Sequence, residues 1–357
     1  MAKNKKITES QMLARLQPGT VVLAPLLVRK CEVLGNGGGR SADAYLELAL
    51  PGKAEHYRFV LETKTRSTPQ GVQLAVAQAR AAVRQGEHPM IQVPYLSPEW
   101  LEKLERQGVS GVDLCGNGVI VVPDRLWIQR SGQPNRYRES RALIDPYRGR
   151  SAMVGRALMQ RPSWSGLNAL AEWTKEQGAR LSLSQVSKAV RAMEEDLVVS
   201  RAKGSIVVSD PQRLLDQLGR GWGRPSIGAR QFLTLPGGRE SLADLSAIPS
   251  LKWTVTGQSA GSRYVVHVQG GPQQIAVTDV ASARIRLGGV IEPVPSFADV
   301  ELLETHEPGF YFGCETDEKG IRWASRLQTW LELQNGDARQ QEAAQELRRQ
   351  ILKGVSA

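Results

Sequence analysis

The spacing of apolar residues changes along this chain, and that change constrains its fold more than any other feature. In the first third, runs typical of strands (21–28, 44–50, 57–63 and 89–95) alternate with apolar residues at helical spacing over 69–84. The middle is helical, and the last third returns to strands at 252–257, 263–269 and 274–280 before helices at 322–334 and 338–353. Interleaved strands and helices predict an α/β or α+β protein with a mixed sheet.

Two stretches with little apolar periodicity divide the chain. Residues 131–150 are rich in arginine and contain two prolines, and residues 219–228 (GRGWGRPSIG) are rich in glycine. Such compositions are typical of linkers. We therefore expect an α/β domain at 1–130, a basic linker at 131–150, a helical domain at 151–218, a second linker at 219–228 and an α+β domain at 229–357, which is a candidate partner-binding region.

The formal net charge of +10 is concentrated in one part of the chain. Residues 1–120 carry a net charge of +4, residues 121–230 carry +9 and residues 231–357 carry −3. A basic middle beside an acidic end indicates a polyanion partner for the middle segment, and nucleic acid is the commonest such partner. The alternative is a surface that is rich in arginine only for solubility.

The helical middle has the element order of a winged helix-turn-helix. Helices are expected over 152–159 and 167–176, and a third is expected from Ser184 after a cap at 182–184. Two short strand-like pieces follow at 200–210, around Lys203 and Gly204. A helix, a turn, a second helix and then a hairpin favour a DNA-binding domain with a recognition helix and a wing.

Polar and basic side chains are predicted on the outer face of the third helix and on the hairpin. Glutamine can pair with adenine in the major groove, and small polar residues allow close approach, whereas lysine and arginine reach phosphates. The candidate DNA-binding residues are Ser184, Gln185, Ser187, Lys188, Arg191, Arg201 and Lys203. We expect double-stranded DNA as the partner.

A second candidate site lies in the first domain. Asp43 begins a strand, and Glu62 and Lys64 end its partner strand nineteen residues later, followed by a polar helix that carries Gln78. This set resembles the PD-(D/E)XK nuclease family, which implies a restriction-endonuclease-like mixed sheet. The resemblance gives Asp43, Glu62, Lys64 and Gln78 as candidate catalytic residues, with Asp43 and Glu62 as candidate ligands of Mg²⁺.

The match to that family is incomplete. Ala42 stands where the motif has proline, and Glu9 is the only acidic residue that fits an N-terminal helix. A degenerate site is the alternative, in which Glu62 and Lys64 form an ion pair. In that case the chain needs no cofactor.

Further motifs resemble the larger bacterial members of the AbiEi family, the antitoxins of type IV toxin–antitoxin systems. The segment PYLSPEWLEKLERQGVSGVDLCGN (94–117) carries the resemblance first, and SDPQRLLDQL (209–218), WTVTGQSA (253–260) and 327–348 extend it. The resemblance implies a DNA-binding repressor whose C-terminal region contacts a nucleotidyltransferase-like toxin. The chain departs from the short antitoxins because some 150 residues precede its helical middle.

Three functions follow from these patterns. The leading expectation is a transcriptional regulator, an autorepressor or antitoxin that binds DNA, with dimers on repeated half-sites. The alternative is a Mg²⁺-dependent endonuclease that the helical domain targets to DNA. The third is an adaptor that uses the wing for protein contact.

Composition excludes membrane and secreted classes of protein. No stretch approaches the roughly 20 apolar residues that span a bilayer, and MAKNKKITES lacks the apolar run of a signal peptide. Three cysteines are too few and too scattered for a disulfide framework. We expect a cytoplasmic protein.

Overall fold

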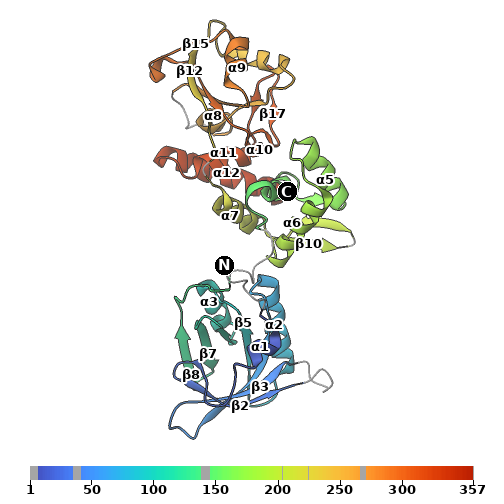
Figure 1. Cartoon of the computed structure of the whole chain (residues 1–357), viewed down its shortest axis with the longest axis vertical. Coiled ribbons are helices and arrows are strands. Elements are labelled where there is room, and N and C mark those ends of the chain that lie inside the picture. Colours follow the sequence, from blue (N-terminus) through green and yellow to red (C-terminus); the bar gives the residue numbers. More distant parts are fainter. Residues whose placement is uncertain are drawn as a thin grey trace. The chain divides into compact units, whose positions relative to one another are not determined.

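A computed structural model describes residues 7–34, 42–137, 145–202, 204–223, 225–265 and 271–356. The chain divides into two compact units, residues 1–143 and residues 144–357. Each unit combines helices with β-strands (Figure 1), which confirms the expected mixed α and β structure. The boundary between the units falls within the expected basic linker at 131–150.

The first unit is built on an eight-stranded sheet whose strands lie side by side in chain order. The strands are β1 (Val21–Leu23), β2 (Leu26–Val33), β3 (Ala44–Ala49), β4 (His56–Thr63), β5 (Glu87–Val93), β6 (Ser110–Asp113), β7 (Gly118–Val122) and β8 (Leu126–Arg130). The β4–β5 and β5–β6 pairs are parallel and the other pairs are antiparallel. The helices are α1 (Glu9–Leu13), α2 (Pro69–Ala82) and α3 (Pro98–Arg106). Because α2 and α3 join the parallel strands, they supply the crossover connections that parallel pairing requires.

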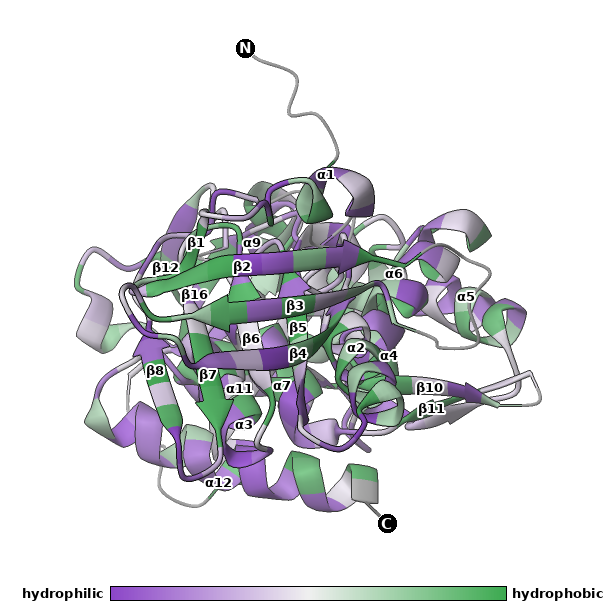
Figure 2. Ribbon diagram, turned by 90° about the horizontal axis from the view of Figure 1, so that it is seen from below, coloured by the Kyte–Doolittle hydropathy of each residue, from purple (hydrophilic) through white to green (hydrophobic). Residues whose placement is uncertain are grey.

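Side-chain alternation gives this sheet two hydrophobic cores. One core contains Phe59, Leu61 and Met90 and extends to Leu13 at the end of α1. The other contains Ile91 and the apolar residues of α2 and α3. Apolar and polar stretches alternate along β2, β3 and β4 (Figure 2). The sheet is therefore covered on both faces.

The helix starts in this unit follow the sequence signals. Thr68 and Ser97 cap α2 and α3 through their side-chain oxygens, and Pro69 and Pro98 occupy the first helical position. The expected single strand at 21–28 is wrong, because β1 and β2 form a hairpin in which Leu23 pairs with Leu26. Pro25 lacks an amide donor for a sheet ladder and lies in the turn instead.

The second unit begins with a helical segment and a small sheet. The elements are α4 (Ala152–Gln160), β9 (Ser163–Trp164), α5 (Leu167–Glu176), α6 (Leu183–Glu195), β10 (Val199–Ala202), β11 (Ser205–Val208) and α7 (Pro211–Gly221). The three strands form an antiparallel sheet in the order β10-β11-β9. Strand β9 has no counterpart in the predicted elements, since two residues are too short for an alternation pattern.

A seven-stranded sheet occupies the rest of this unit, in the order β15-β12-β16-β14-β13-β18-β17. Its strands are β12 (Arg230–Thr234), β13 (Trp253–Val255), β14 (Gln273–Val277), β15 (Val290–Ile291), β16 (Val300–Glu304), β17 (Glu315–Thr316) and β18 (Arg322–Trp323). The α-helices are α8 (Gly257–Tyr264), α9 (Val280–Leu287), α10 (Pro308–Tyr311), α11 (Arg326–Leu333) and α12 (Ala338–Ser356). Short 3-10 segments lie at Gly149–Ser151, Arg239–Ala247 and Pro295–Phe297.

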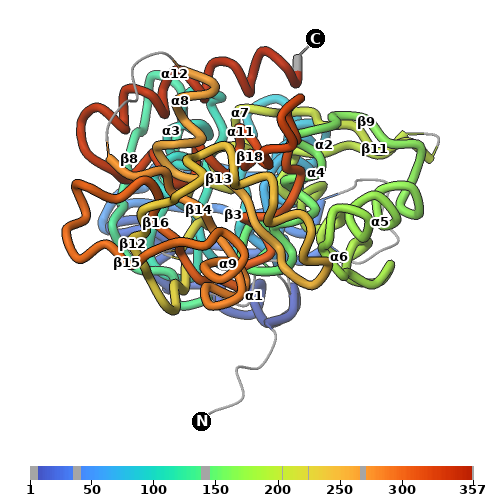
Figure 3. The backbone as a smooth tube through the Cα atoms, turned by 90° about the horizontal axis from the view of Figure 1, so that it is seen from above, coloured from blue at the N-terminus to red at the C-terminus, as the bar shows by residue number. Residues whose placement is uncertain are grey.

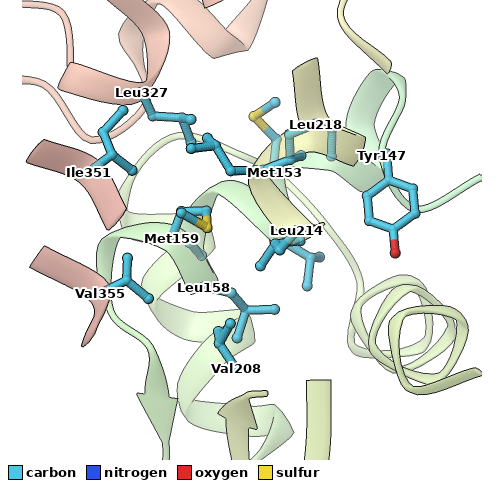
Figure 4. Packing of buried hydrophobic residues seen from close by; sticks show 14 of the residues in the cluster. Tyr147, Met153, Leu158, Met159, Val208, Leu214, Leu218, Leu327, Ile351 and Val355 are labelled. Atoms are coloured by element: carbon cyan, nitrogen blue, oxygen red, sulfur yellow. The ribbon is translucent and has the colours of Figure 1, made fainter. Parts of the chain in front are cut away.

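One hydrophobic core joins the helical segment to the C-terminal helices. Met153 and Leu158 of α4 and Leu218 of α7 share this core with Leu327 of α11 and Ile351 of α12 (Figure 4). Helix α12 also lies beside α8 and α11 (Figure 3). The segments that the sequence assigns to separate domains, 151–218 and 229–357, are thus packed into one compact unit.

Three expected elements of this unit differ from the structure. Residues 263–264 of the expected strand 263–269 end helix α8, and residues 266–269 lie outside the described ones. The helix expected at 322–334 starts only at Arg326, since Arg322 and Trp323 form β18 and Ser325 is the cap. The expected linker at 219–228 is helical through Gly221.

Candidate functional site

Three of the four residues of the predicted nuclease-like set, Asp43, Glu62 and Lys64, meet at the carboxyl end of β4. The backbone N–H of Thr63 donates to Asp43 Oδ2 at 2.7 Å, so the carboxylate of Asp43 is held against β4. Lys64 Nζ lies 3.1 Å from Glu62 Oε2. The structure therefore brings Asp43, Glu62 and Lys64 together, and Glu62 and Lys64 form an ion pair.

Glu62 is the buried member of this group, with 2% of its surface exposed. Burial raises the pKa of its carboxyl, the neighbouring charge of Asp43 raises it further, and Lys64 lowers it. The charge of Glu9 in α1 also raises the pKa of Glu62, which places that residue near the site. A raised carboxyl pKa beside a second carboxylate is common at functional sites.

Four buried side-chain oxygens at this end of the sheet have no hydrogen-bond partner in the described structure: Glu62 Oε1, Thr63 Oγ1, Gln78 Oε1 and Gln92 Oε1. Gln78 lies on α2, which packs against β4 and β5, and Gln92 on β5 is the register partner of Thr63. Unsatisfied buried polar atoms are rare in native proteins. Sequence reasoning missed Thr63 and Gln92, although a glutamine in the apolar run PMIQV was a signal.

The donor set fits a hard cation through two carboxylates. Among the described residues, no group of three or more Asp, Glu, His or Cys side chains could hold a metal ion. A Mg²⁺ site does not require three protein ligands, because this ion is often bound by one or two carboxylates together with waters and phosphate oxygens. Asp43 and the free Oε1 of Glu62 are oxygens of that kind.

The second candidate site is the outer face of α6. Ser182 and Gln185 form a capping box at its start, and Val186, Val190 and Met193 bury the inner face. The predicted residues Ser184, Gln185, Lys188 and Arg191 are exposed, and Ser187 is half-buried. The predicted separation of polar and apolar faces is therefore present along this helix.

The polar and basic side chains on the outer face of α6 differ in whether they already have hydrogen-bond or ion-pair partners within the protein. Gln185 Oε1 accepts a hydrogen bond from the backbone N–H of Ser182 at 2.9 Å, so this oxygen serves the cap. Arg191 Nε lies 3.6 Å from Glu195 Oε1, and Arg201 on β10 pairs with Glu194. Lys188 has no ion-pair partner among the described residues. Its charge is therefore the least neutralised of those predicted on α6.

Two features near α6 were outside the predicted set. Arg180 is exposed two residues before the cap, at the amino-terminal end of the helix. The β10–β11 hairpin pairs Ala202 with Ser205 around a two-residue loop, in which Gly204 has a φ of 86°. Lys203, the predicted basic residue of that loop, lies outside the described residues.

The DLCGN motif has a structural role in this fold. The Asp113 carboxylate accepts hydrogen bonds from the backbone N–H groups of Leu96, Cys115 and Asn117 and from Asn117 Nδ2. Gly116 has a φ of 98°, a conformation that other residues rarely adopt. The motif thus fixes the turn between β6 and β7.

Comparison with family models, curated proteins and solved structures finds no match to this chain. No described helix combines the length and the apolar character that crossing a membrane requires. The geometry of the two sites is therefore the basis for the function.

Proposed function

We propose that the chain binds duplex DNA through α6 and the β10–β11 hairpin. The observation that carries this proposal is the element order α4, β9, α5, α6, β10, β11, with a polar outer face on α6 and an antiparallel three-stranded sheet beside it. In this interpretation α6 is the recognition helix of a winged helix-turn-helix and the hairpin is its wing.

The chemistry of the exposed residues supports the proposal. Gln185 still has its side-chain N–H₂ group to offer a base, and Ser184 is small enough for close approach to the groove. Lys188 and the exposed Arg180 supply positive charge for phosphates. The net charge of +9 over residues 121–230 favours the same partner.

The experiment is a fluorescence-anisotropy titration with labelled duplex DNA from the region upstream of the chain's own gene. We expect Lys188→Ala with Arg201→Ala to weaken binding and to reduce the slope of log K against log salt by about 0.9 for each lost phosphate contact. Lys353→Ala, which removes an exposed charge from α12, is the matched control. Unchanged affinity and salt slope in the double variant refute the proposal.

The resemblance to the AbiEi family extends this proposal to regulation. In that extension the chain is a dimeric autorepressor in the cytoplasm, and its C-terminal region binds a cognate toxin. Co-expression with the neighbouring reading frame, followed by size-exclusion chromatography, tests the partner. A separate elution of the two proteins contradicts the toxin assignment and leaves the DNA proposal intact.

A second candidate function is Mg²⁺-dependent DNA cleavage. It is favoured by Asp43, Glu62 and Lys64 at one strand end and by the buried Glu62 Oε1 that lacks a partner. The order α1, β2, β3, β4, α2, β5, with three antiparallel strands before a parallel crossover, also suits a restriction-endonuclease-like core.

In this function Asp43 and Glu62 would hold Mg²⁺, which when bound activates water and neutralises phosphate charge. Lys64 would orient the Glu62 carboxylate and place a positive charge beside the scissile phosphate. A cleavage assay on supercoiled plasmid with added Mg²⁺ tests the activity. We expect Glu62→Gln and Lys64→Met to abolish it, while Glu55→Gln, which removes an exposed carboxylate between β3 and β4, does not. Absence of cleavage in the unaltered chain leaves DNA binding as the function.

A further inference from the structure

A cavity of about 400 Å³ lies inside the second unit, at a place that neither proposed function uses. Its walls come from the start of α4, the end of α7 and the residues around α10. Met153, Leu218 and Leu331 supply apolar surface, Trp222 supplies an aromatic ring, and Arg156 supplies a guanidinium. The volume falls in the range of roughly 300–1,000 Å³ that is usual for small-molecule sites.

Arg156 is the unusual member of this wall. It is 3% exposed, and it forms no ion pair with any described residue. Burial lowers the pKa of its guanidinium to about 10, so it remains a cation at neutral pH. A buried cation is costly to a fold, and the charges of Glu332 and Glu307 and the Trp222 ring offset that cost without a direct ion pair. An anion bound directly to the guanidinium would offset it further.

The hydrogen bonds of Arg156 leave one edge of its guanidinium without a partner in the described structure. Nη1 donates to the Gly309 carbonyl at 3.0 Å and to Gln328 Oε1 at 2.7 Å. Nε is buried without a hydrogen-bond partner, and no hydrogen bond of Nη2 is present in the described structure. The edge formed by Nε and Nη2 is the one that binds a carboxylate or phosphate through two parallel hydrogen bonds.

The guanidinium is also held in place on its flat sides. Its Cζ lies 5.2 Å from the centre of the Trp222 ring, a cation–π contact. Gly309 packs so closely that a Cβ there would lie 2.8 Å from Nη1 and 3.0 Å from Cζ. The ring and the glycine therefore preorganise the cation before any ligand arrives.

The acidic residues near Arg156 make no ion pair with it in the described structure. Glu332 and the exposed Glu307 raise the pKa of Arg156 through their charges. Gln328 stands between Arg156 and Glu332, since its side chain accepts from Arg156 and donates to Glu332, whose carboxylate also accepts from Thr256 Oγ1 at 2.7 Å. The Arg150 side chain is exposed at the cavity and adds positive charge.

We propose that this cavity binds a small organic anion, with a carboxylate or phosphate on Arg156 and a flat apolar body against Trp222. The assignment is independent of DNA binding and of nuclease activity. Because α4 forms one wall of the cavity and also packs on α6, an occupied site would bear on the proposed recognition helix.

Isothermal titration calorimetry on the full chain tests the site with benzoate and with phenyl phosphate, and with neutral benzamide as the uncharged probe. We expect at least one anion to bind at millimolar concentration or better and benzamide to bind at least about tenfold more weakly. The preferred anion identifies the headgroup as carboxylate or phosphate.

Variants test whether binding depends on Arg156 and Trp222 and not on another arginine. Arg156→Lys keeps the charge but loses the two-pronged edge, and we expect it to weaken binding about tenfold or more, while Trp222→Ala weakens it through the lost ring. Arg161→Lys is the matched control, since Arg161 also stacks on a tryptophan, Trp164, outside the cavity. Circular dichroism checks that each variant is folded. Absence of heat with both anions, or equal weakening by Arg161→Lys, overturns the proposal.

Discussion

Neighbouring charges decide which basic residues of α6 are available to a polyanion. Lys188 and Arg191 lie about one turn apart on the same face, but only Arg191 has a carboxylate of its own helix within reach. Exposed ion pairs at this spacing are worth only a few tenths of a kcal/mol. They nevertheless reduce the net positive charge that a phosphate meets.

We therefore expect Lys188→Ala to weaken DNA binding more than Arg191→Ala does. The lysine has no ion-pair partner among the described residues, whereas the charge of Arg191 is already partly neutralised by Glu195. Anisotropy titrations at several salt concentrations should show a slope reduced by about 1 for Lys188→Ala. An equal loss of affinity in both variants contradicts this ranking.

A buried carboxyl near Arg156 links stability to pH. Loss of contact with water raises the pKa of Glu332, although hydrogen bonds from Gln328, Thr256 and Gly257 and the charge of Arg156 lower it in part. A carboxyl whose pKa is raised by folding contributes stability at low pH, and that contribution is lost as pH rises through the folded pKa.

We expect the melting temperature of the chain to fall as pH rises above the ordinary value of 4.5 toward neutral, relative to a Glu332→Gln variant. Because glutamine does not ionise, the variant should show a flatter profile over that window. Differential scanning calorimetry from acid to neutral pH provides the measurement. Parallel profiles for the two proteins would falsify the assignment of this pH dependence to Glu332.

At the residue scale, the spacing of residues along the chain predicts the contacts of a site whose members lie within one hairpin. Alternation within one hairpin was enough to bring Asp43, Glu62 and Lys64 together. Gln92 lies beside Thr63 because β4 and β5 pair in parallel. The ion pair between Arg201 and Glu194 forms because the β10–β11 hairpin folds back on α6. Such contacts are absent from any local pattern, so the sequence could not reveal them.

At the scale of the elements, Gly155 is where α4 approaches both α6 and α7 closely. A Cβ at this position would lie 3.1 Å from Leu218 Cδ2 of α7 and 3.1 Å from Met193 Cε of α6. The glycine lets three helices approach one another closely, despite its cost of about 1 kcal/mol in a helix relative to alanine.

We expect Gly155→Val to destabilise the second unit by about 1–3 kcal/mol through overpacking. In Gly155→Ala the gain in helix propensity offsets much of the crowding, so its change should stay within about 1 kcal/mol. Urea unfolding followed by circular dichroism gives both values. Gly354→Val is the control, since Gly354 is helical with nothing within 4 Å of an added Cβ.

The elements that the sequence predicted share a length of several residues and a clear cap. Helices α2, α3 and α6 begin directly after the caps Thr68, Ser97 and Ser182, because each cap side chain accepts a hydrogen bond from a backbone N–H of the first turn. The two-residue strand β9 depends on pairing with β11. Helix α8 ends at Tyr264, the second residue of the run 263–269 that the sequence predicts as a strand.

On the scale of the whole molecule, the second unit depends on the last helix. Ala344, Leu347 and Ile351 of α12 are buried in the core that also contains the residues of α4 and α7. Arg348 of α12 also forms an ion pair with Asp216 of α7, with 2.6 Å between Nη2 and Oδ1, so a surface contact joins these two helices as well.

We expect truncation after Asp337 to unfold the second unit and to abolish DNA binding, because each large buried apolar side chain contributes about 2 kcal/mol or more. The first unit has its own two cores and should keep its own unfolding transition. Limited proteolysis with mass spectrometry distinguishes these outcomes. Native-like DNA affinity in the truncated chain contradicts the prediction.

The core shared by α4, α7, α11 and α12 also sets an order of events during synthesis. Ribosomes release the chain from its amino-terminal end, and domains generally fold as they emerge. The first unit can therefore close its cores early, whereas α4 must wait for residues up to Val355 before its buried face is fully covered. The segment proposed to bind DNA thus becomes competent only after α12 has left the ribosome.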